Sequence, residues 1–307
     1  MRSFLAENRI TENLRPLDKM QRILDGLYGG EEAFSYVAQE TLSASEAFEK
    51  RRGNCVSFAM LFVSLAREVG LDARFNQIDY SPVWEEIGGI LVETTHINVI
   101  VYSAGSQYVV ESLPEYAEVA SRSRNPIPDE RVFSHYFNNS GLLALAEGEM
   151  SRALELIKSA IETDPTNGSA WQNLGLYRFR EGDNLAGEEA LLEASKQNSR
   201  SSSVCFLLSQ YYEKTGEVAK AETFARLGAK RSKKNPFFHY YKSREALEEG
   251  DLKKAIKRLE KAQRLLPQYA KFQAELVSLR QLLDSGRGIA QTHQGETSTA
   301  ERSLRKH

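Results

Sequence analysis

A glycine recurs every 34 residues in the second half of the chain. Gly148, Gly182, Gly216 and Gly250 each follow a helix-like stretch and precede another one. A glycine permits the tight turn that two antiparallel helices need between them. A fourfold period of this length indicates a solenoid, in which each helix pair packs mainly on its neighbours. The second half of the chain is therefore predicted to be all-α.

Small residues and a proline accompany these glycines. They lie at the same offsets from the first and the fourth glycine: Ala153, Ala160 and Pro165, then Ala255, Ala262 and Pro267. The small residues let two helices approach closely, and the proline ends the second helix. The third repeat is weaker, with Gly228 and Lys233 where Ala and Pro are expected. This pattern resembles the tetratricopeptide repeat (TPR) over about residues 134–269.

The resemblance implies four repeats and a closing helix. The repeats would lie near 134–167, 168–201, 202–235 and 236–269, and a capping helix would span 270–284. Apolar residues of this last helix recur at helical spacing: Phe272, Leu276, Leu279 and Leu283. A solenoid needs such a helix to cover its last apolar face. We predict a TPR domain at 133–284, followed by a disordered polar tail at 285–307.

In repeats of this type, the first helix of each pair lines a concave groove. By the 34-residue phase, the groove residues would be Asn138, Leu142, Leu145, Gln172, Leu176, Phe179, Phe206, Gln210, Tyr240, Arg244 and Leu247. The set is apolar and aromatic with a few amides, and it lacks the Lys and Asn cluster that clamps a C-terminal carboxylate elsewhere in the family. It predicts a protein or peptide partner with an apolar face. The alternative is that the groove packs against the chain's own N-terminal domain.

The N-terminal half contains a cysteine at the predicted start of a helix. Asn54 is a good N-cap, Cys55 follows in the first turn, and Gly70 is a good stop. The segment between them is apolar around most of its circumference, so the helix should be central and buried. The helix dipole favours the thiolate of Cys55. Cys55 could also be a small core residue, as free cysteines often are.

Two short strands follow, at 94–102 and 107–112, with Ala104 and Gly105 between them as a tight turn. This turn pairs residue 98 with residue 111, so His96 and Glu111 become diagonal neighbours on one face. A carboxylate beside a histidine can fix its tautomer, and an imidazolium stabilises a thiolate. Taken singly, His96 could be an ordinary strand residue and Glu111 an exposed edge charge.

The order of Cys, His and carboxylate resembles the transglutaminase-like superfamily over about residues 15–120. The resemblance implies an α+β, papain-like domain at 15–132, after an N-terminal extension at 1–14. It also implies roles: Cys55 as nucleophile, His96 as general base and acid, and Glu111 as the orienting carboxylate. The family usually has Asp at the last position, and the extra methylene of Glu moves the carboxylate by roughly 1 Å. On this resemblance, Glu111→Asp should retain or raise activity.

The implied chemistry is acyl transfer through a Cys55 thioester on a protein or peptide substrate. Water as acceptor would make the protein a cysteine protease or amidase, and an amine would make it an acyl transferase. The alternative is a catalytically degenerate domain that serves a TPR scaffold. The backbone N–H of Cys55 is a candidate oxyanion donor, and Gln77 and Trp84 are candidates either for the cleft or for packing.

Composition limits the remaining possibilities. Lys plus Arg number 40 against 42 Asp plus Glu, so the net charge of −2 gives no nucleic-acid signal. No histidine pair has metal-ligand spacing, no cofactor is needed, and Cys205 is interpreted as structural. The longest apolar run, 56–66, is too short for a membrane span, and residues 1–14 lack the apolar region of a signal peptide. The chain as given is expected to be cytoplasmic, or periplasmic or envelope-anchored if an upstream signal is missing.

Overall fold

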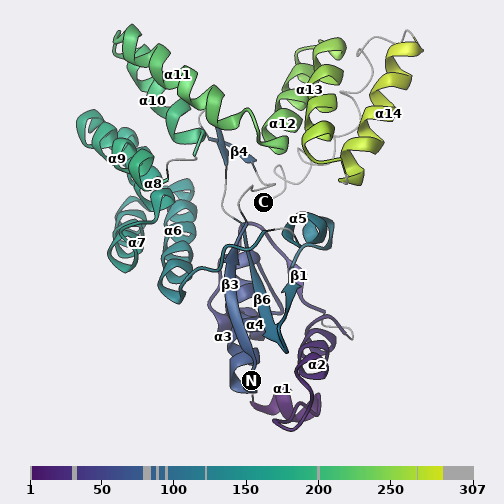
Figure 1. The fold of residues 1–307 in the computed structure, drawn as a ribbon. Coiled ribbons are helices and arrows are strands. Elements are labelled where there is room, and N and C mark those ends of the chain that lie inside the picture. Colours follow the sequence, from purple (N-terminus) through teal and green to yellow (C-terminus); the bar gives the residue numbers. More distant parts are fainter. Residues whose placement is uncertain are drawn as a thin grey trace, which may run out of the picture. The chain divides into compact units, whose positions relative to one another are not determined.

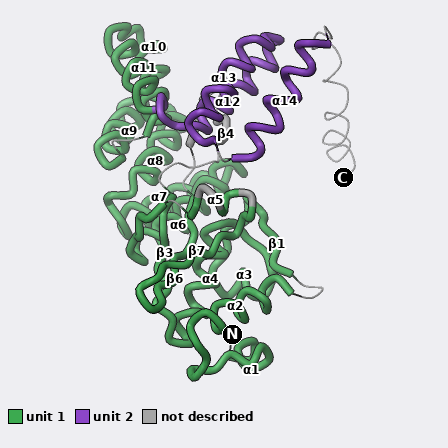
Figure 2. Tube along the Cα trace, turned by 45° about the vertical axis from the view of Figure 1, so that its right-hand side comes forward, with its two compact units in different colours: residues 1–231 green, residues 232–307 purple. Residues whose placement is uncertain are grey.

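A computed structural model describes residues 2–29, 33–78, 84–87, 90–93, 96–121, 123–198, 201–267 and 269–285. The chain divides into two compact units, residues 1–231 and 232–307 (Figure 2). The sequence predicted a domain boundary near residue 132, where the repeat pattern begins. That boundary differs from the division into compact units and stays a prediction. The predicted tail, from residue 286 onward, lies outside the described residues.

The N-terminal region is a mixed α/β fold, as predicted (Figure 1). Its elements are α1 (Arg2–Glu7), α2 (Pro16–Tyr28), β1 (Ser35–Tyr36), α3 (Ala44–Lys50), β2 (Arg52–Gly53), α4 (Cys55–Glu68), β3 (Asp72–Gln77), β4 (Trp84–Ile87), β5 (Ile90–Glu93), β6 (Ile97–Ser103), β7 (Ser106–Val110), the 3₁₀ helix η1 (Pro114–Tyr116) and α5 (Ala117–Ala120). The main sheet is antiparallel with strand order β3-β6-β7. A parallel pair β1-β2 and an antiparallel hairpin β4-β5 complete the strands in the described part of the region.

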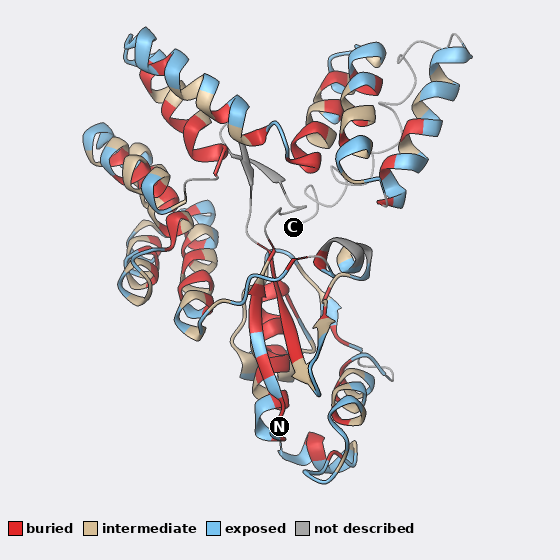
Figure 3. Ribbon diagram, in the orientation of Figure 1, coloured by how far each residue is buried: buried red, intermediate tan, exposed pale blue. Residues whose placement is uncertain are grey.

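Helix α4 is the centre of this region and packs against β3 and β6. Ten of its 14 residues are buried. Figure 3 shows much of α4 and of the neighbouring strand β6 in the colour of buried residues. Fully burying a side chain such as Phe58, Phe62 or Leu65 stabilises a fold by roughly 1.5–3 kcal/mol. The first residue of α4 is therefore held in place by the best-packed element of the domain.

The β6-β7 hairpin has the predicted turn and register. Ala104 and Gly105 have φ angles of 48° and 78°, the left-handed values that a two-residue type I′ turn requires. Ser103 pairs with Ser106 and Val99 with Val110. Continuing this register by one residue sets position 98 opposite position 111, so the residues that flank the two strands come together at the far end of the hairpin.

The C-terminal region is an all-α, TPR-like array of paired helices. The pairs are α6 (Asp129–Glu147) with α7 (Met150–Thr163), α8 (Gly168–Glu181) with α9 (Asn184–Gln197), α10 (Ser203–Lys214) with α11 (Val218–Ser232), and α12 (Pro236–Glu248) with α13 (Leu252–Leu265), followed by α14 (Ala270–Asp284). Gly148, Gly182, Gly216 and Gly250 end the first helix of each pair with φ between 80° and 85°. The 34-residue glycine period thus marks the turn inside each pair, as predicted.

A second 34-residue period marks close contacts between paired helices, at Gly141, Gly175, Ser209 and Ser243. A Cβ atom at Gly141 would lie 2.9 Å from Cγ1 of Ile157, so there is no room for a side chain. Ser209 turns its hydroxyl into the facing helix and donates to the carbonyl of Ala221 at 2.9 Å. At this position each repeat therefore has either a glycine, which has no side chain, or a serine whose hydroxyl donates a hydrogen bond to the facing helix.

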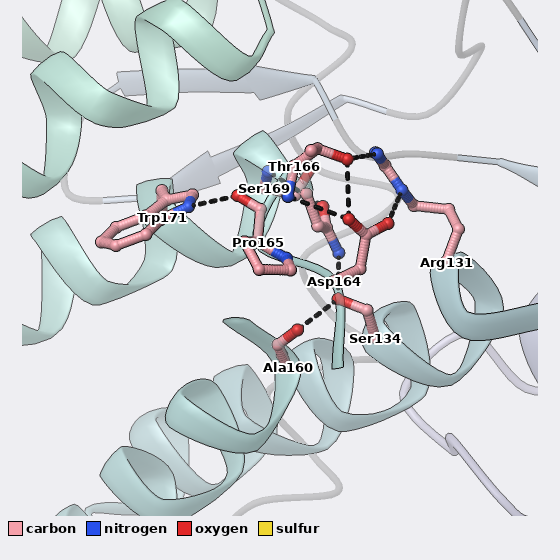
Figure 4. Close-up of polar contacts among 9 residues, drawn as sticks. Arg131, Ser134, Ala160, Asp164, Pro165, Thr166, Ser169 and Trp171 are labelled. Carbon is pink, nitrogen blue, oxygen red and sulfur yellow. Dashed lines mark hydrogen bonds and ion pairs between the residues drawn. The ribbon is translucent and has the colours of Figure 1, made fainter. Parts of the chain in front are cut away.

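Polar side chains fasten the first pair to the second around Pro165 (Figure 4). Ser134 donates to the carbonyl of Ala160 at 2.7 Å and accepts from Asn167 Nδ2 at 2.8 Å. The indole N–H of Trp171 donates to the Pro165 carbonyl at 2.8 Å. Because these polar groups are satisfied by one another, they can be buried at the turn between repeats beside the apolar contacts of Ala160 and Ala170.

The ends of the array differ in detail from the predicted boundaries. Helix α6 begins at Asp129, five residues before the predicted first repeat. Asp129 accepts from Arg67 Nη2 at 2.9 Å, which links the start of α6 to the last turn of α4. At the other end, Phe272 and Leu276 of α14 are buried, whereas Leu283 is 40% exposed. The capping helix thus uses only the N-terminal part of its predicted apolar stripe.

Candidate active site

Cys55 is the first residue of α4, where the sequence predicted it. Asn54 caps the helix, since its Oδ1 accepts from the N–H groups of Val56 and Ser57 at 3.1 and 3.2 Å. The cap is itself anchored, because Asn54 Nδ2 donates to Thr41 Oγ1 at 2.6 Å. Gly53 precedes it with φ of 150°, and a Cβ there would lie 2.6 Å from Cβ of Ser57. Only glycine fits this entry to the helix.

His96 directly precedes β6 and is 1% exposed. Its Nε2 lies 2.8 Å from Oε1 of Glu111. The ring of Tyr116 packs edge-on against the imidazole, with centroids 5.9 Å apart. Because Nε2 faces the carboxylate, Nδ1 is the ring nitrogen left for the hydrogen bond between His96 and the Cys55 thiol. The structure thus brings together all three predicted catalytic residues.

Glu111 directly follows β7, and its side chain is 4% exposed. One oxygen, Oε1, faces His96 and also accepts from the Leu113 N–H at 3.0 Å. The other, Oε2, accepts from Asn98 Nδ2 at 3.2 Å. A buried carboxylate requires such partners. Both oxygens therefore have partners, which hold the carboxylate with Oε1 next to His96.

The environment favours a thiolate–imidazolium pair. Burial opposes ionisation of Cys55, but the charge and hydrogen bond of His96 and the N–H of Ile97 together lower the thiol pKa. Burial also disfavours the charged imidazole, yet Cys55 and Glu111 outweigh it and raise the pKa of His96 to about 10. The two shifts have opposite signs, so a proton on His96 and a negative charge on Cys55 stabilise each other.

The first turn of α4 also offers an oxyanion donor. Asn54 accepts from the amides of Val56 and Ser57, whereas the Cys55 N–H has no acceptor within the described residues. A free amide at a helix start, next to the nucleophile, is suited to a developing oxyanion. This N–H is the donor expected from the sequence, and its role stays a prediction.

The site is almost closed, since Cys55 is only 6% exposed. Tyr28 is 39% exposed, and its ring lies 5.7 Å from the Phe58 ring of α4. Burial and the charge of Glu111 both raise the pKa of Tyr28, so its hydroxyl stays protonated. Sequence reasoning missed Tyr28, which is distant in sequence from the site residues, and Tyr116, which lies beyond the hairpin whose register predicted the site.

The remaining sequence candidates lie elsewhere or are not described. Gln77 ends β3, and its backbone binds to Asn125 and Ser123. The side chain of Trp84 lies outside the described residues. Cys205 is buried on α10, where Arg231 Nη1 donates to its sulfur at 3.0 Å. Burial nevertheless raises the pKa of the Cys205 thiol, which fits a structural role.

The predicted groove residues fall into two groups. Asn138, Leu145 and Gln172 are buried, and two of them bond to the neighbouring pair: Asn173 donates to Asn138 at 2.9 Å and Ser203 to Gln172 at 3.0 Å. These three serve the packing between helices. The others are half-buried or exposed: Leu142, Leu176, Phe179, Phe206 and Gln210 in the first unit, and Tyr240, Arg244 and Leu247 in the second. This second group keeps some exposed surface, although Leu176 and Phe179 also pack against the core of the array.

Among the residues that the structure describes, no group of three or more His, Cys, Asp and Glu side chains could hold a metal ion. None of the described helices combines the length and the apolar character needed to cross a membrane.

The N-terminal region combines a mixed α/β fold with a buried Cys–His–carboxylate arrangement. Residues 5–110 match the model of the transglutaminase-like superfamily, so the chain carries a transglutaminase-like domain. The match includes Cys55 and His96 and ends directly before Glu111. No curated protein matches the chain.

Solved structures resemble the helical part of the chain. They include PilF of Pseudomonas aeruginosa, with 17% identity over 52% of this chain and 71% of that one and a TM-score of 0.33. MamA has 21% identity over 45% and 81% of the two chains, with a TM-score of 0.31. A thermophilic TPR protein of Thermus thermophilus has 21% identity over 48% and 82%, with a TM-score of 0.32. The description of the array as TPR-like rests on its own helix pairs and glycine turns.

Proposed function

We propose that this protein is a thiol-dependent acyl-transfer enzyme that acts on a protein or peptide, with Cys55 as nucleophile, His96 as general acid and base, and Glu111 as the group that orients His96. The observation that carries the proposal is the hydrogen-bonded series from Cys55 through His96 to Glu111 inside the core. Buried titratable groups with opposed pKa shifts are typical of catalytic sites.

The steps follow from the positions of the protons. The Cys55 thiolate attacks the carbonyl carbon, and the oxyanion that forms accepts from the Cys55 N–H. His96 then gives its Nδ1 proton to the leaving amine, the carbon–nitrogen bond breaks, and a thioester remains. Neutral His96 next takes a proton from the acceptor, which attacks the thioester and releases the Cys55 thiolate. Water as acceptor gives hydrolysis, and an amine gives a new amide.

The TPR-like array would select the partner. Its available groove residues are mainly apolar and aromatic, which suits an apolar helix or extended segment. Arg244 is the only charged residue in that group, so capture of a peptide terminus by charge is not part of the proposal.

A second candidate is the scaffold, in which the thiol domain is inactive and only the array works. The observation in its favour is the 6% exposure of Cys55, because a substrate has to displace neighbouring side chains before it reaches the sulfur. The two candidates differ in whether Cys55 is a reactive thiolate in the folded protein.

The pH dependence of Cys55 alkylation separates them. Iodoacetamide labelling, with Cys55 and Cys205 peptides quantified by mass spectrometry, should show a midpoint for Cys55 below the value near 8.5 of a free cysteine. His96→Ala should move the midpoint upward, because it removes the proton that stabilises the thiolate. A Cys55 profile like that of free cysteine, or labelling only after unfolding, would instead favour the scaffold.

A further inference from the structure

Behind Glu111 lies a line of buried amides that the three-residue site does not account for. Asn98 Nδ2 donates to Glu111 Oε2 at 3.2 Å, and Asn76 Nδ2 donates to Asn98 Oδ1 at 2.7 Å. The backbone N–H of Asn125 donates to Asn76 Oδ1 at 2.7 Å. Asn76 and Asn98 are 0% and 1% exposed. Such amides are rarely buried unless their hydrogen bonds are satisfied.

The direction of this line is fixed by its far end. A backbone N–H can only donate, so the Asn76 atom facing Asn125 must be the oxygen. The Asn76 NH₂ group then points at Asn98, whose oxygen accepts. The remaining NH₂ group of Asn98 has to face Glu111. The backbone of residue 125 thus determines, through two side chains, that a donor rather than an acceptor meets the carboxylate.

We propose that Asn98, oriented by Asn76, is a positioning residue that keeps Glu111 directed at His96. A Glu side chain has one more rotatable bond than the Asp usual in the family, so its carboxylate can turn away more easily. Asn98 holds Oε2 while Oε1 stays 2.8 Å from His96 Nε2. This inference rests on the proposed function, because it assigns Asn98 and Asn76 a role through Glu111 in the same reaction.

The array contains a matched control. Asn173 Nδ2 donates to Asn138 Oδ1 at 2.9 Å, and both residues are 4% exposed. This pair has the same chemistry and similar burial to Asn76–Asn98, but in the described part of the chain no hydrogen bond links it to a carboxylate or a thiol. Asn76→Asp and Asn173→Asp each replace the donating NH₂ with oxygen at nearly constant shape. Both variants should lose comparable stability, and only the first should affect Cys55.

The test is the pH profile of Cys55 alkylation by iodoacetamide in the full chain. The charged or titratable groups that act on Cys55 are His96 and Glu111. Asn76→Asp and Asn98→Ser should raise the midpoint by about one pH unit, which is about tenfold less thiolate at a fixed lower pH. Asn173→Asp should leave the midpoint unchanged. If the wild-type midpoint lies below that of free cysteine and Asn76→Asp and Asn98→Ser have the same midpoint, the inference fails while the proposed function stands. A wild-type midpoint equal to that of free cysteine overturns both.

A measurement on the wild-type protein covers the case in which these variants do not fold. Alkylation of Cys55 removes the thiolate partner of His96, and the disturbance should pass through Glu111 to Asn98. In NMR spectra, the side-chain amide signals of Asn98 should shift and those of Asn173 should not. Unchanged Asn98 signals would overturn the positioning role.

Discussion

Both halves of the molecule contain a buried cysteine next to a cation, yet the two thiols differ. Cys55 has His96 and the Ile97 N–H against its sulfur, and its pKa is lowered despite burial. Cys205 has Arg231 Nη1 at 3.0 Å, and burial still raises its pKa. One cation therefore does not make a buried thiol reactive. Several interactions have to act on the same sulfur to lower its pKa. Cys55 meets this condition, because it lies at the start of a capped helix and also contacts His96 and the Ile97 N–H.

The halves also differ in how their hydrogen bonds are distributed along the sequence. In the array, the same contacts recur at 34-residue spacing, so each repeat contributes a similar share. In the thiol domain, the site depends on single residues from α4, β3 and β6 and from the positions directly before β6 and after β7. A substitution in the array should therefore weaken one interface, whereas one in the site should remove a function.

The largest expected contrast is between the two cysteines themselves. Cys55→Ser should reduce acylation by p-nitrophenyl acetate by about 10³-fold or more, because a serine hydroxyl is not ionised by His96. Cys205→Ser should leave the rate unchanged. Release of p-nitrophenol at pH 7, with protein acetylation followed by mass spectrometry, measures both. Equal rates in the two variants would mean that Cys55 is not the nucleophile.

A smaller contrast concerns two glycines with positive φ. Gly182→Ala in the array should cost about 1 kcal/mol, because the left-handed backbone is strained for alanine but a Cβ meets nothing within 4 Å. Gly53→Ala should cost about 3 kcal/mol or more, since strain adds to the 2.6 Å contact with Ser57. Hydrogen exchange read by mass spectrometry gives the opening free energies of the two regions separately. Similar costs at both positions would show that the backbone before Asn54 adapts.

These contrasts show what the sequence could predict. The cap at Asn54, the start of α4 and the turn at Gly105 depend on neighbouring residues, so local chemistry predicted them. The meeting of His96 and Glu111 followed from the register of one hairpin. The glycine turns followed from a period. Each of these needs only short-range or repeated information.

The line from Asn125 to Glu111 could not be predicted in the same way. Asn76 lies on β3, which joins β6 across 22 residues, and Asn125 belongs to a segment after α5. Nothing in the local sequence marks Asn76 as different from an ordinary strand amide. The burial of predicted groove residues such as Gln172 was missed for the same reason, because its partner Ser203 belongs to the next repeat.

The smallest effect concerns the length of the Glu111 side chain. The family resemblance alone favours Glu111→Asp as neutral or activating, but the hydrogen bonds favour the opposite. Asp is shorter by about 1 Å and cannot reach His96 and Asn98 together, and a misplacement of that size is costly at a reacting centre. We expect Glu111→Asp to lower acylation about tenfold, or about 1.4 kcal/mol in the barrier. Glu111→Gln should lose more, because it also removes the negative charge beside His96.

The control is Glu188→Asp in the array, where the carboxylate accepts from Tyr212 and acylation should not change. Rates of p-nitrophenol release for the three variants decide the matter. An unchanged or faster Glu111→Asp enzyme would show that the site tolerates the shorter acid, and that Asn98 serves packing alone.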